Sequence, residues 1–218
     1  MSTLKVDSIQ LEFGDRKILR DVFISCTQGE VVGLLGRNGC GKSSLLKIIF
    51  GALKPSYKYL SINDVPIDEG CKHNIAYLPQ HNYLPKGIAI NKLAPMLVDD
   101  RYWNSFINTK IYNDHRYKKA EQLSGGELRQ LEMLMIVYSK ADFILLDEPF
   151  THVTPVQAEN FKTIIKAVSK TKGIIVTDHQ YENILDVSDR IIFIKDGATK
   201  PVNSVADLVA YNYLSGIN

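Results

Sequence analysis

The chain has 218 residues, 45% of them hydrophobic, and a formal net charge of +2. This length allows one large α/β domain or two closely packed lobes, and the hydrophobic fraction can supply a sizeable core. The charge lacks the strong basic excess typical of nucleic-acid-binding domains, so we expect no nucleic-acid partner.

Apolar runs in the sequence are too short to cross a membrane. A spanning helix needs about 20 apolar residues in succession, whereas the best runs here are Met133–Tyr138 and Ile174–Val176. The N-terminus lacks the apolar stretch of a signal peptide. Three cysteines, Cys26, Cys40 and Cys71, are an odd number without paired metal spacing. We therefore expect a cytoplasmic chain in a reducing compartment that contacts a membrane only through a partner.

The first elements in chain order have the patterns of strands. Leu4–Phe13 alternates apolar and polar residues like a half-buried strand, and Val22–Ser25 is typical of its antiparallel neighbour. Glu30–Leu35 contains a continuous apolar run that stops at Gly36, which predicts a strand covered on both faces. Ser43–Phe50 then has helical spacing. The predicted order is strand, glycine-rich loop, helix.

Later apolar runs alternate with helical stretches. This alternation predicts a parallel sheet with crossover helices. Strands are expected at Phe143–Leu146, Gly173–Thr177 and Ile191–Ile194, and helices near Pro155–Val168 and Tyr181–Asp186.

Two other stretches depart from this alternation. Gln80–Gln122 is rich in Asn, Tyr, Lys and Asp and contains no buried-strand run, so we predict a mostly helical insertion there. Lys195–Gly197 is typical of a hairpin turn, and a short amphipathic helix is expected over Ser204–Leu214.

Residues Gly36–Ser43 spell GRNGCGKS and fit the phosphate-loop pattern G-x-x-x-x-G-K-[ST] between a predicted strand and helix. Glycines let backbone N–H groups converge on a β-phosphate, and the helix N-terminus adds positive potential. Lys42 would reach the β- and γ-oxygens, and the Ser43 hydroxyl would bind Mg²⁺. The alternative is a glycine-rich turn with an exposed lysine, which does not require the full pattern. We expect nucleotide binding by the residues of this loop: Gly36, Arg37, Asn38, Gly39, Cys40, Gly41, Lys42, Ser43 and Ser44.

A second buried run ends in two carboxylates, Asp147 and Glu148, followed by Pro149. The carboxyl ends of strands are where an α/β sheet binds its ligands. We expect Asp147 to hold Mg²⁺, through water, and Glu148 to polarise the attacking water. The alternative is a strand that ends in solvated acids before a proline turn. The nearby phosphate loop favours the functional interpretation.

The segment Leu123–Glu127 spells LSGGE. Ser124 and Glu127 form an S-x-x-E capping box at the start of a helix that runs to Tyr138. A capped glycine-rich helix start also leaves backbone N–H groups available to an anion. The phosphate loop, this LSGGE and the following ILLDEP, in this order, resemble the nucleotide-binding domain of ATP-binding cassette (ABC) transporters over nearly the whole chain.

The resemblance implies an α/β fold with a P-loop NTPase core, an antiparallel N-terminal β subdomain and an inserted helical subdomain. A single ABC ATPase domain would then span residues 1–218, with the RecA-like core and the β subdomain in 1–80 and 124–218 and the helical subdomain in 81–123. The implied activity is Mg²⁺-dependent ATP hydrolysis that powers transport through separate transmembrane permease subunits, which would dock on the helical subdomain.

The resemblance also implies a dimer with two ATP sites. The signature residues of one cassette would close over the γ-phosphate held by the phosphate loop of another: Ser124, Gly125, Gly126 and Glu127. A lone subunit should therefore be a poor ATPase. We expect the second cassette to be another copy of this chain; the alternative is a different cassette that supplies the complementary half.

Three further residues obtain roles from the resemblance. Phe13 matches the aromatic that stacks on adenine, Gln80 the glutamine that contacts Mg²⁺ or water, and His179 the switch histidine that touches the γ-phosphate. The alternative interpretation gives them no functional role: Phe13 would be a buried edge-strand residue, Gln80 a solvated loop residue and His179 an ordinary residue at the end of a strand.

The spellings TDHQ and DEPF are most similar to the ATPases of lipopolysaccharide export and branched-chain amino-acid import. Gln130 and Met135 stand where the family often has arginines, which predicts fewer interlobe ion pairs. Thr154 replaces an aspartate expected near the partner cassette. Thr154–Gln157 nevertheless has a good N-cap, a proline at the first helical position and a glutamine at the third.

Two alternatives stay open at this stage. One is a non-transport ABC protein that acts as a regulatory or interaction module, although the sequence has neither an inserted long coiled coil nor a second cassette. The other is a catalytically dead subunit, which the presence of Lys42, Asp147, Glu148 and His179 disfavours.

Overall fold

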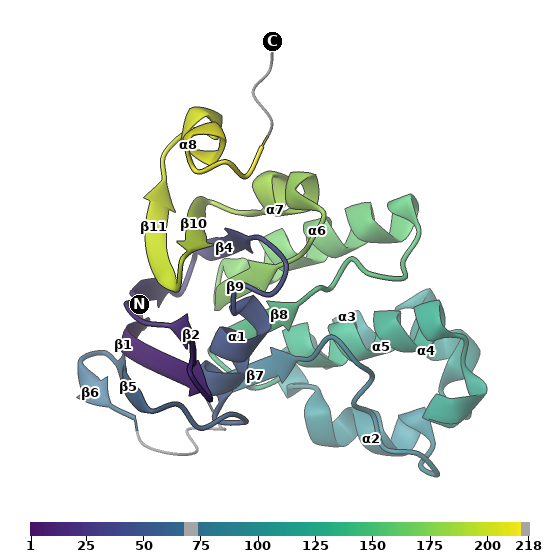
Figure 1. Cartoon of the computed structure of the whole chain (residues 1–218). Helices are drawn as coiled ribbons and strands as arrows, with labels where there is room; N and C mark the ends of the chain where they lie inside the picture. Colours follow the sequence, from purple (N-terminus) through teal and green to yellow (C-terminus); the bar gives the residue numbers. More distant parts are fainter. Residues whose placement is uncertain (68–73, 215–218) are drawn as a thin grey trace.

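The computed structural model describes residues 1–67 and 74–214, and a six-stranded sheet forms its centre (Figure 1). The strand order is β11-β10-β4-β9-β8-β7, parallel except for β11. The predicted parallel sheet is confirmed. The strands span Val31–Gly36 (β4), Ile75–Leu78 (β7), Phe143–Asp147 (β8), Gly173–Thr177 (β9), Arg190–Lys195 (β10) and Ala198–Val202 (β11). Cys71, which we expected to be a reduced thiol, lies outside the described residues.

A second sheet is antiparallel and forms the N-terminal part of the chain. It consists of β1 (Thr3–Phe13), β2 (Arg16–Leu19), β3 (Ile24–Thr27), β5 (Tyr57–Ile62) and β6 (Val65–Pro66). The strand predicted at Val22–Ser25 was misplaced, because pairing with β1 begins only at Ile24. The residue directly before Ile24 contacts β11 instead: the Phe23 N–H donates to Thr199 Oγ1 at 2.8 Å.

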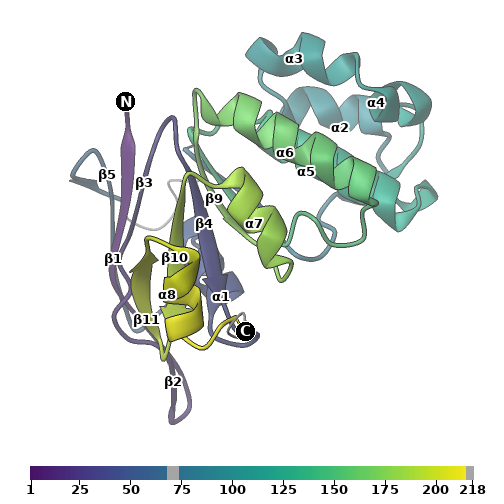
Figure 2. The ribbon, with the colours of Figure 1, turned by 90° about the horizontal axis from the view of Figure 1, so that it is seen from above.

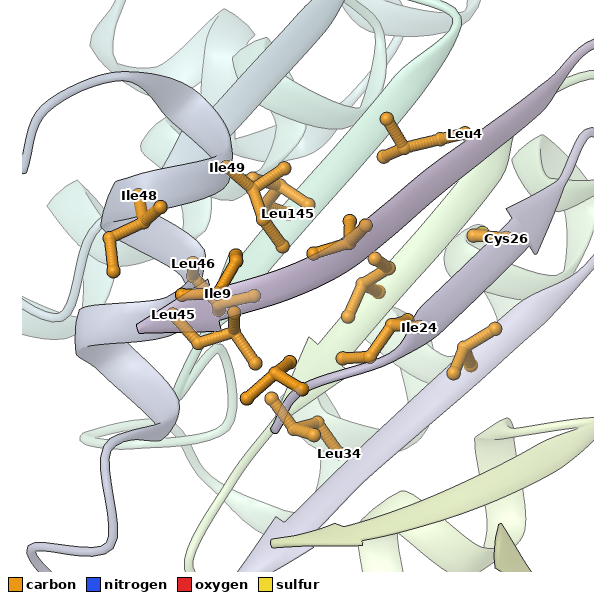
Figure 3. Packing of buried hydrophobic residues seen from close by; sticks show 14 of the residues in the cluster. Leu4, Ile9, Ile24, Cys26, Leu34, Leu45, Leu46, Ile48, Ile49 and Leu145 are labelled. Carbon is orange, nitrogen blue, oxygen red and sulfur yellow. The ribbon is translucent and has the colours of Figure 1, made fainter. Parts of the chain in front are cut away.

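The first helix, α1 (Lys42–Phe50), packs into the core between β4 and the antiparallel sheet. Figure 3 shows its apolar side chains beside those of β1, β3 and β4. Leu45, Ile9 and Leu34 in this core have no exposed surface. Truncating such a leucine to alanine typically costs about 2–5 kcal/mol. This packing fixes the N-terminus of α1 at the end of β4, where the phosphate-loop residues lie.

Helices cover the other face of the central sheet. The long helices α5 (Gly125–Val137) and α6 (Pro155–Ser169) lie side by side, with α7 (Tyr181–Val187) next to the sheet (Figure 2). Phe161 of α6 and Val176 of β9 are fully buried in one apolar cluster with residues of these helices.

The stretch between Gln80 and Gln122 is helical, as predicted. It contains α2 (Ile90–Leu97), α3 (Asp100–Ile107), α4 (Lys110–His115) and a 3₁₀ turn, η1 (Ala120–Gln122). These helices share an apolar cluster with α5 and lie on the side away from the antiparallel sheet (Figure 2). The division of the chain into 1–80 with 124–218 and 81–123 stays a prediction.

The last helix is shorter than predicted. α8 spans Val205–Ala210 rather than Ser204–Leu214, because Asn212 adopts a left-handed φ of 58° and reverses the chain. Tyr211 and Tyr213 then pack on Phe193, with ring centroids 5.4 and 5.2 Å away. The predicted turn at Lys195–Gly197 is confirmed, with positive φ at Asp196 and Gly197. Within the described part of the chain, no helix combines the length and apolarity needed to cross a bilayer.

Candidate functional site

A cavity of about 520 Å³ lies where β4, β7, β8 and β9 end. Ligand sites of α/β folds are expected at this carboxyl edge of the parallel strands. Most residues around the cavity come from the segments that directly follow these strands. The lining residues are Phe13, Ile18, Asn38, Gly39, Gly41, Lys42, Ser43, Ser44, Gln80, Glu148 and His179.

The phosphate-loop sequence forms the turn from β4 into α1. Gly41 is the N-cap of α1 at φ 107°, and a Cβ there would lie 2.8 Å from Leu19 Cδ2, so only glycine fits without strain. No side chain caps the first turn of α1. Its backbone N–H groups are therefore available to an anion, which the helix dipole also attracts.

Lys42 lies across this turn and is 9% exposed. Its ammonium donates to Gly36 O at 2.7 Å and to Arg37 O at 3.3 Å. The positive charge is therefore held on the wall of the cavity, where a phosphate oxygen could replace a carbonyl as its acceptor.

Asp147 connects the end of β8 to two hydroxyl groups. Ser43 Oγ donates to its Oδ1 and Tyr77 OH to its Oδ2, both at 2.9 Å. The side chain is fully buried, and burial raises the pKa of its carboxyl above the ordinary value. A nearby cation would oppose that rise by stabilising the carboxylate.

The oxygen atoms at this point suit Mg²⁺. Ser43 and Asp147 supply a hydroxyl and a carboxylate oxygen, the hard ligands that Mg²⁺ prefers. Within residues 1–67 and 74–214, no three His, Cys, Asp or Glu side chains gather into a metal site. The remaining ligands would come from water and nucleotide phosphates, as is usual for Mg²⁺ at phosphoryl-transfer sites.

Glu148 lies at the meeting point of the predicted catalytic side chains. Gln80 Nε2 donates to its Oε2 at 2.9 Å, and His179 Nδ1 lies 3.8 Å from the same oxygen. The backbone of Glu148 has a left-handed φ of 51°, which is costly for a non-glycine residue. Its N–H donates to Thr177 O at 2.8 Å. The chain is held in a strained conformation that directs the carboxylate into the cavity.

A family model described as ABC transporter matches residues 19–151, more than half of the chain. The chain belongs to the ABC transporter family. The predicted family is thereby confirmed, and the activity is that of an ATP-binding, ATP-hydrolysing subunit that powers a transporter.

Curated ABC proteins are similar to this chain over most of its length. An ABC transporter ATP-binding protein of Methanocaldococcus jannaschii is 28% identical over 94% of this chain and 79% of its own length. The lipopolysaccharide export system ATP-binding protein LptB of Escherichia coli K12 is 28% identical over 90% of this chain and 88% of its own. The similarity to LptB agrees with the resemblance to lipopolysaccharide-export ATPases that the sequence shows.

Solved structures show the same ABC fold. An ATP-binding subunit of an ABC transporter superposes with a TM-score of 0.83 at 21% identity, covering 98% of this chain and 95% of that one. A bacterial Atm1-family ABC exporter with ATP bound gives 0.78 at 18% identity, covering 96% of this chain and 40% of that one. The predicted P-loop NTPase fold is confirmed.

Some predicted site residues of this ABC protein lie outside the cavity lining. Arg37 and Cys40 border a smaller cavity of about 210 Å³, and Arg37 Nη2 donates to Asn212 O at 2.7 Å. Gly36 is packed beneath the loop, where a Cβ would lie 2.6 Å from Cys40 Sγ. These residues shape the loop by contacts on its far side.

The ABC signature is also separate from the cavity. Ser124 caps α5 and forms the predicted capping box with Glu127, whose Oε2 accepts from the Ser124 N–H and Oγ, both at 2.8 Å. His115 Nε2 lies 3.1 Å from Glu127 Oε1. Within this chain, none of the four residues Ser124, Gly125, Gly126 and Glu127 lines the cavity.

Sequence reasoning missed three residues that support the site. Tyr77 holds Asp147, and the available signal was its position three residues before Gln80. Asp178 is 1% exposed and accepts from the Phe150 and Gln180 N–H groups, both at 3.0 Å. Burial raises the pKa of its carboxyl.

The third missed residue is Arg129, directly before Gln130, which is one of the two positions where arginines were expected. Met135 is fully buried in the helical cluster, and Gln130 Oε1 accepts from Gln157 Nε2 at 3.4 Å. Arg129, on the same helix, donates instead to backbone carbonyls at the ends of β7 and β8. No periodicity in the sequence indicated this.

Proposed function

We propose that the cavity binds Mg·ATP and that Glu148 activates the water that attacks its γ-phosphate. The observation that carries this proposal is the convergence of Gln80 and His179 on one oxygen of Glu148, beside Lys42. A carboxylate held in this way can polarise water, and the neighbouring groups can align it.

Each of the other residues has a role that its position supports. Lys42 binds the β- and γ-phosphate oxygens, and the loop residues that line the cavity surround them: Asn38, Gly39, Gly41, Ser43 and Ser44. Ser43 and Asp147 hold Mg²⁺, with Gln80 close by, and the bound ion neutralises charge on the phosphates. His179 contacts the γ-phosphate. Phe13 is 56% exposed at the rim of the cavity, where its ring can stack on adenine.

A second cassette completes the site in this proposal. The signature residues Ser124, Gly125, Gly126 and Glu127 lie apart from the cavity of their own chain, at the N-terminus of a 13-residue helix. Such a helix end attracts phosphate. Two copies of this chain, each placing its signature against the nucleotide of the other, supply both sites with the missing donors.

The proposed complex includes transmembrane subunits. The family membership and the relatives named as transporter ATP-binding proteins support this partner. We place the docking surface on the helical subdomain, residues 81–123, because it follows Gln80 directly and can transmit a displacement to it. The cassette pair then lies on the cytoplasmic face of the membrane, in contact with it through these partners.

The test is ATP-dependent dimerisation of the Glu148→Gln chain, measured by light scattering with and without Mg·ATP. The variant should be a monomer alone and a dimer with Mg·ATP, because hydrolysis no longer releases the trapped pair. The matched control adds Lys42→Ala to the same chain and should stay monomeric. A Glu148→Gln chain that remains monomeric at high ATP and protein concentration would contradict the two-copy site.

A further inference from the structure

A buried arginine connects the catalytic ends of two strands. Arg129 is 4% exposed and is the fifth residue of α5. Its Nη1 donates to Pro79 O at 2.7 Å, and its Nη2 donates to the carbonyls of Asp147 and Glu148, both at 2.9 Å. The first carbonyl belongs to the residue directly before Gln80, and the other two belong to the carboxylate residues themselves.

Glu132 holds the other side of the same segment, one helical turn along α5. It has no exposed surface, and its Oε1 accepts from the N–H groups of Tyr83 and Leu84 at 2.7 and 3.1 Å. The chain from Pro79 to Leu84 is therefore fixed to α5 on both sides of Gln80. Glu132 Oε2 lies 3.9 Å from Arg129 Nη1, so the two side chains also form an ion pair.

The chemistry of this pair is unusual for a structural contact. Desolvation on burial is the largest effect on both side chains. It lowers the pKa of Arg129 and raises the pKa of Glu132. The guanidinium nevertheless remains charged at neutral pH. A buried ion pair is weak support for stability, because hydrophobic residues of similar volume often replace one at no cost. The planar fork of arginine can instead donate to two strand ends simultaneously, which a lysine ammonium does not reproduce.

We propose that Arg129 is a positioning residue for ATP hydrolysis, which sets the distance between Gln80 and Glu148 by holding the backbone on both sides of the 2.9 Å contact between them. The proposal rests on the proposed roles of Glu148 and Gln80. Displacements of about 1 Å in a catalytic group can lower a rate about 100-fold. The same residue makes no contact with the cavity, so nucleotide affinity should not depend on it.

The test uses the purified full-length chain with Arg129→Lys, which keeps the positive charge but not the fork. Arg190→Lys is the matched control. Arg190 also donates to a backbone carbonyl, Ser25 O at 2.7 Å, and to Glu30 at 2.8 Å, at the edge of the sheet where β10 begins, opposite the site. The measurements are kcat for Mg·ATP, Kd for Mg·ADP, which is not hydrolysed, and the melting temperature.

Arg129→Lys should lower kcat between about 10- and 100-fold and change Kd for Mg·ADP by less than about twofold. Arg190→Lys should leave kcat within about twofold of the wild-type value, even if it lowers the melting temperature as much as Arg129→Lys does. If the lysine variant unfolds at the assay temperature, Arg129→Gln, with an aliphatic stem and one amide donor, carries the same test. A kcat like that of Arg190→Lys, or parallel losses in kcat and affinity, would overturn the proposal.

A Glu148→Gln chain in the same assay distinguishes a failure of the positioning role of Arg129 from a failure of the proposed catalytic role of Glu148. If Glu148→Gln is inactive and Arg129→Lys is fully active, only the positioning role fails. If Glu148→Gln turns over normally, the proposed catalytic role of Glu148 fails and the positioning role fails with it.

Discussion

Ser43 Oγ donates to Asp147 Oδ1 at 2.9 Å, which joins the first turn of α1 to the end of β8. The two residues are 104 positions apart in the chain. Their contact brings a hydroxyl and a carboxylate to one point beside the phosphate loop, and this is the arrangement on which the proposed Mg²⁺ site depends.

Ser43→Ala should therefore reduce Mg²⁺-dependent binding of ATP. Removing one oxygen ligand of the ion and one hydrogen bond to buried Asp147 should weaken Mg·ATP binding by about 10-fold, as expected for a loss of about 1.5 kcal/mol. ATP binding in EDTA should change much less. The control is Ser105→Ala, at an exposed position of α3. Equal losses with and without Mg²⁺ would indicate that Ser43 does not serve the ion.

Lys42→Ala should weaken ATP binding whether or not Mg²⁺ is present, because it removes the buried cation of the loop. Hydrogen bonds to charged groups are worth about 1.5–3 kcal/mol, so Kd should rise at least about 10-fold. Calorimetric titration checks this against Lys166→Ala, which removes an exposed lysine of α6. An unchanged Kd in Lys42→Ala would exclude the phosphate-loop role.

Thr154 stands where the resemblance implies an aspartate, and it forms a complete cap of its helix. It caps α6, its Oγ accepting from the Gln157 N–H at 3.3 Å and its N–H donating to Gln157 Oε1 at 2.8 Å. Thr154→Asp exchanges one good N-cap for another, so the free energy of unfolding should change by less than about 1 kcal/mol in urea denaturation. Thr154→Ala, which has no cap, should lose about 1 kcal/mol. A larger effect of the aspartate would show that threonine has a structural role beyond capping.

Lys172 should make stability depend on pH. It is 2% exposed, donates to Ser139 O and lies 5.1 Å from the centroid of the Tyr102 ring. Burial lowers its pKa to about 8, and the charge of Arg101 adds to this, while Asp99 and Asp142 oppose it. The lysine of the unfolded chain titrates near 10.4. Between these values the unfolded chain binds more protons, so the free energy of unfolding rises with pH.

The gain from Lys172 should be about 2.5 kcal/mol between pH 7 and pH 10. Urea unfolding of the wild type and of Lys172→Met at both pH values isolates it, since other titrating groups contribute equally to both chains. The variant should lack most of the rise. The same rise in both chains would show that Lys172 is not the group responsible.

Much of the fold could be predicted because its signals are local. The run at Gly173–Thr177 forms β9 with the predicted bounds, and GRNGCGKS places strand, loop and helix within one continuous segment. Two of the strands that were missed have no such pattern. Tyr57–Ile62 begins with exposed tyrosines on either side of a lysine, and β11 contains Pro201 on an edge strand. Their pairing partners decide that they are strands, and these are distant in sequence.

The candidate site also contains residues that have a local signal in the sequence and residues that have none. Lys42, Ser43, Asp147 and Glu148 could be predicted because each lies at the end of a predicted strand or the start of a helix. Arg129 could not, because the carbonyls that it contacts are 18 to 50 residues away and its position on α5 looks like any other polar helical residue. Such contacts depend on how α5 crosses the sheet, which periodicity does not specify.

The turnover number of Glu148→Gln for Mg·ATP shows whether Glu148 activates water at the end of β8. A neutral amide keeps the shape and the Gln80 contact but is a poor base, so kcat should fall at least about 100-fold while Kd for Mg·ADP stays within about twofold. Glu159→Gln, an exposed glutamate of α6, should turn over normally. A Glu148→Gln chain with the kcat of that control would contradict the account.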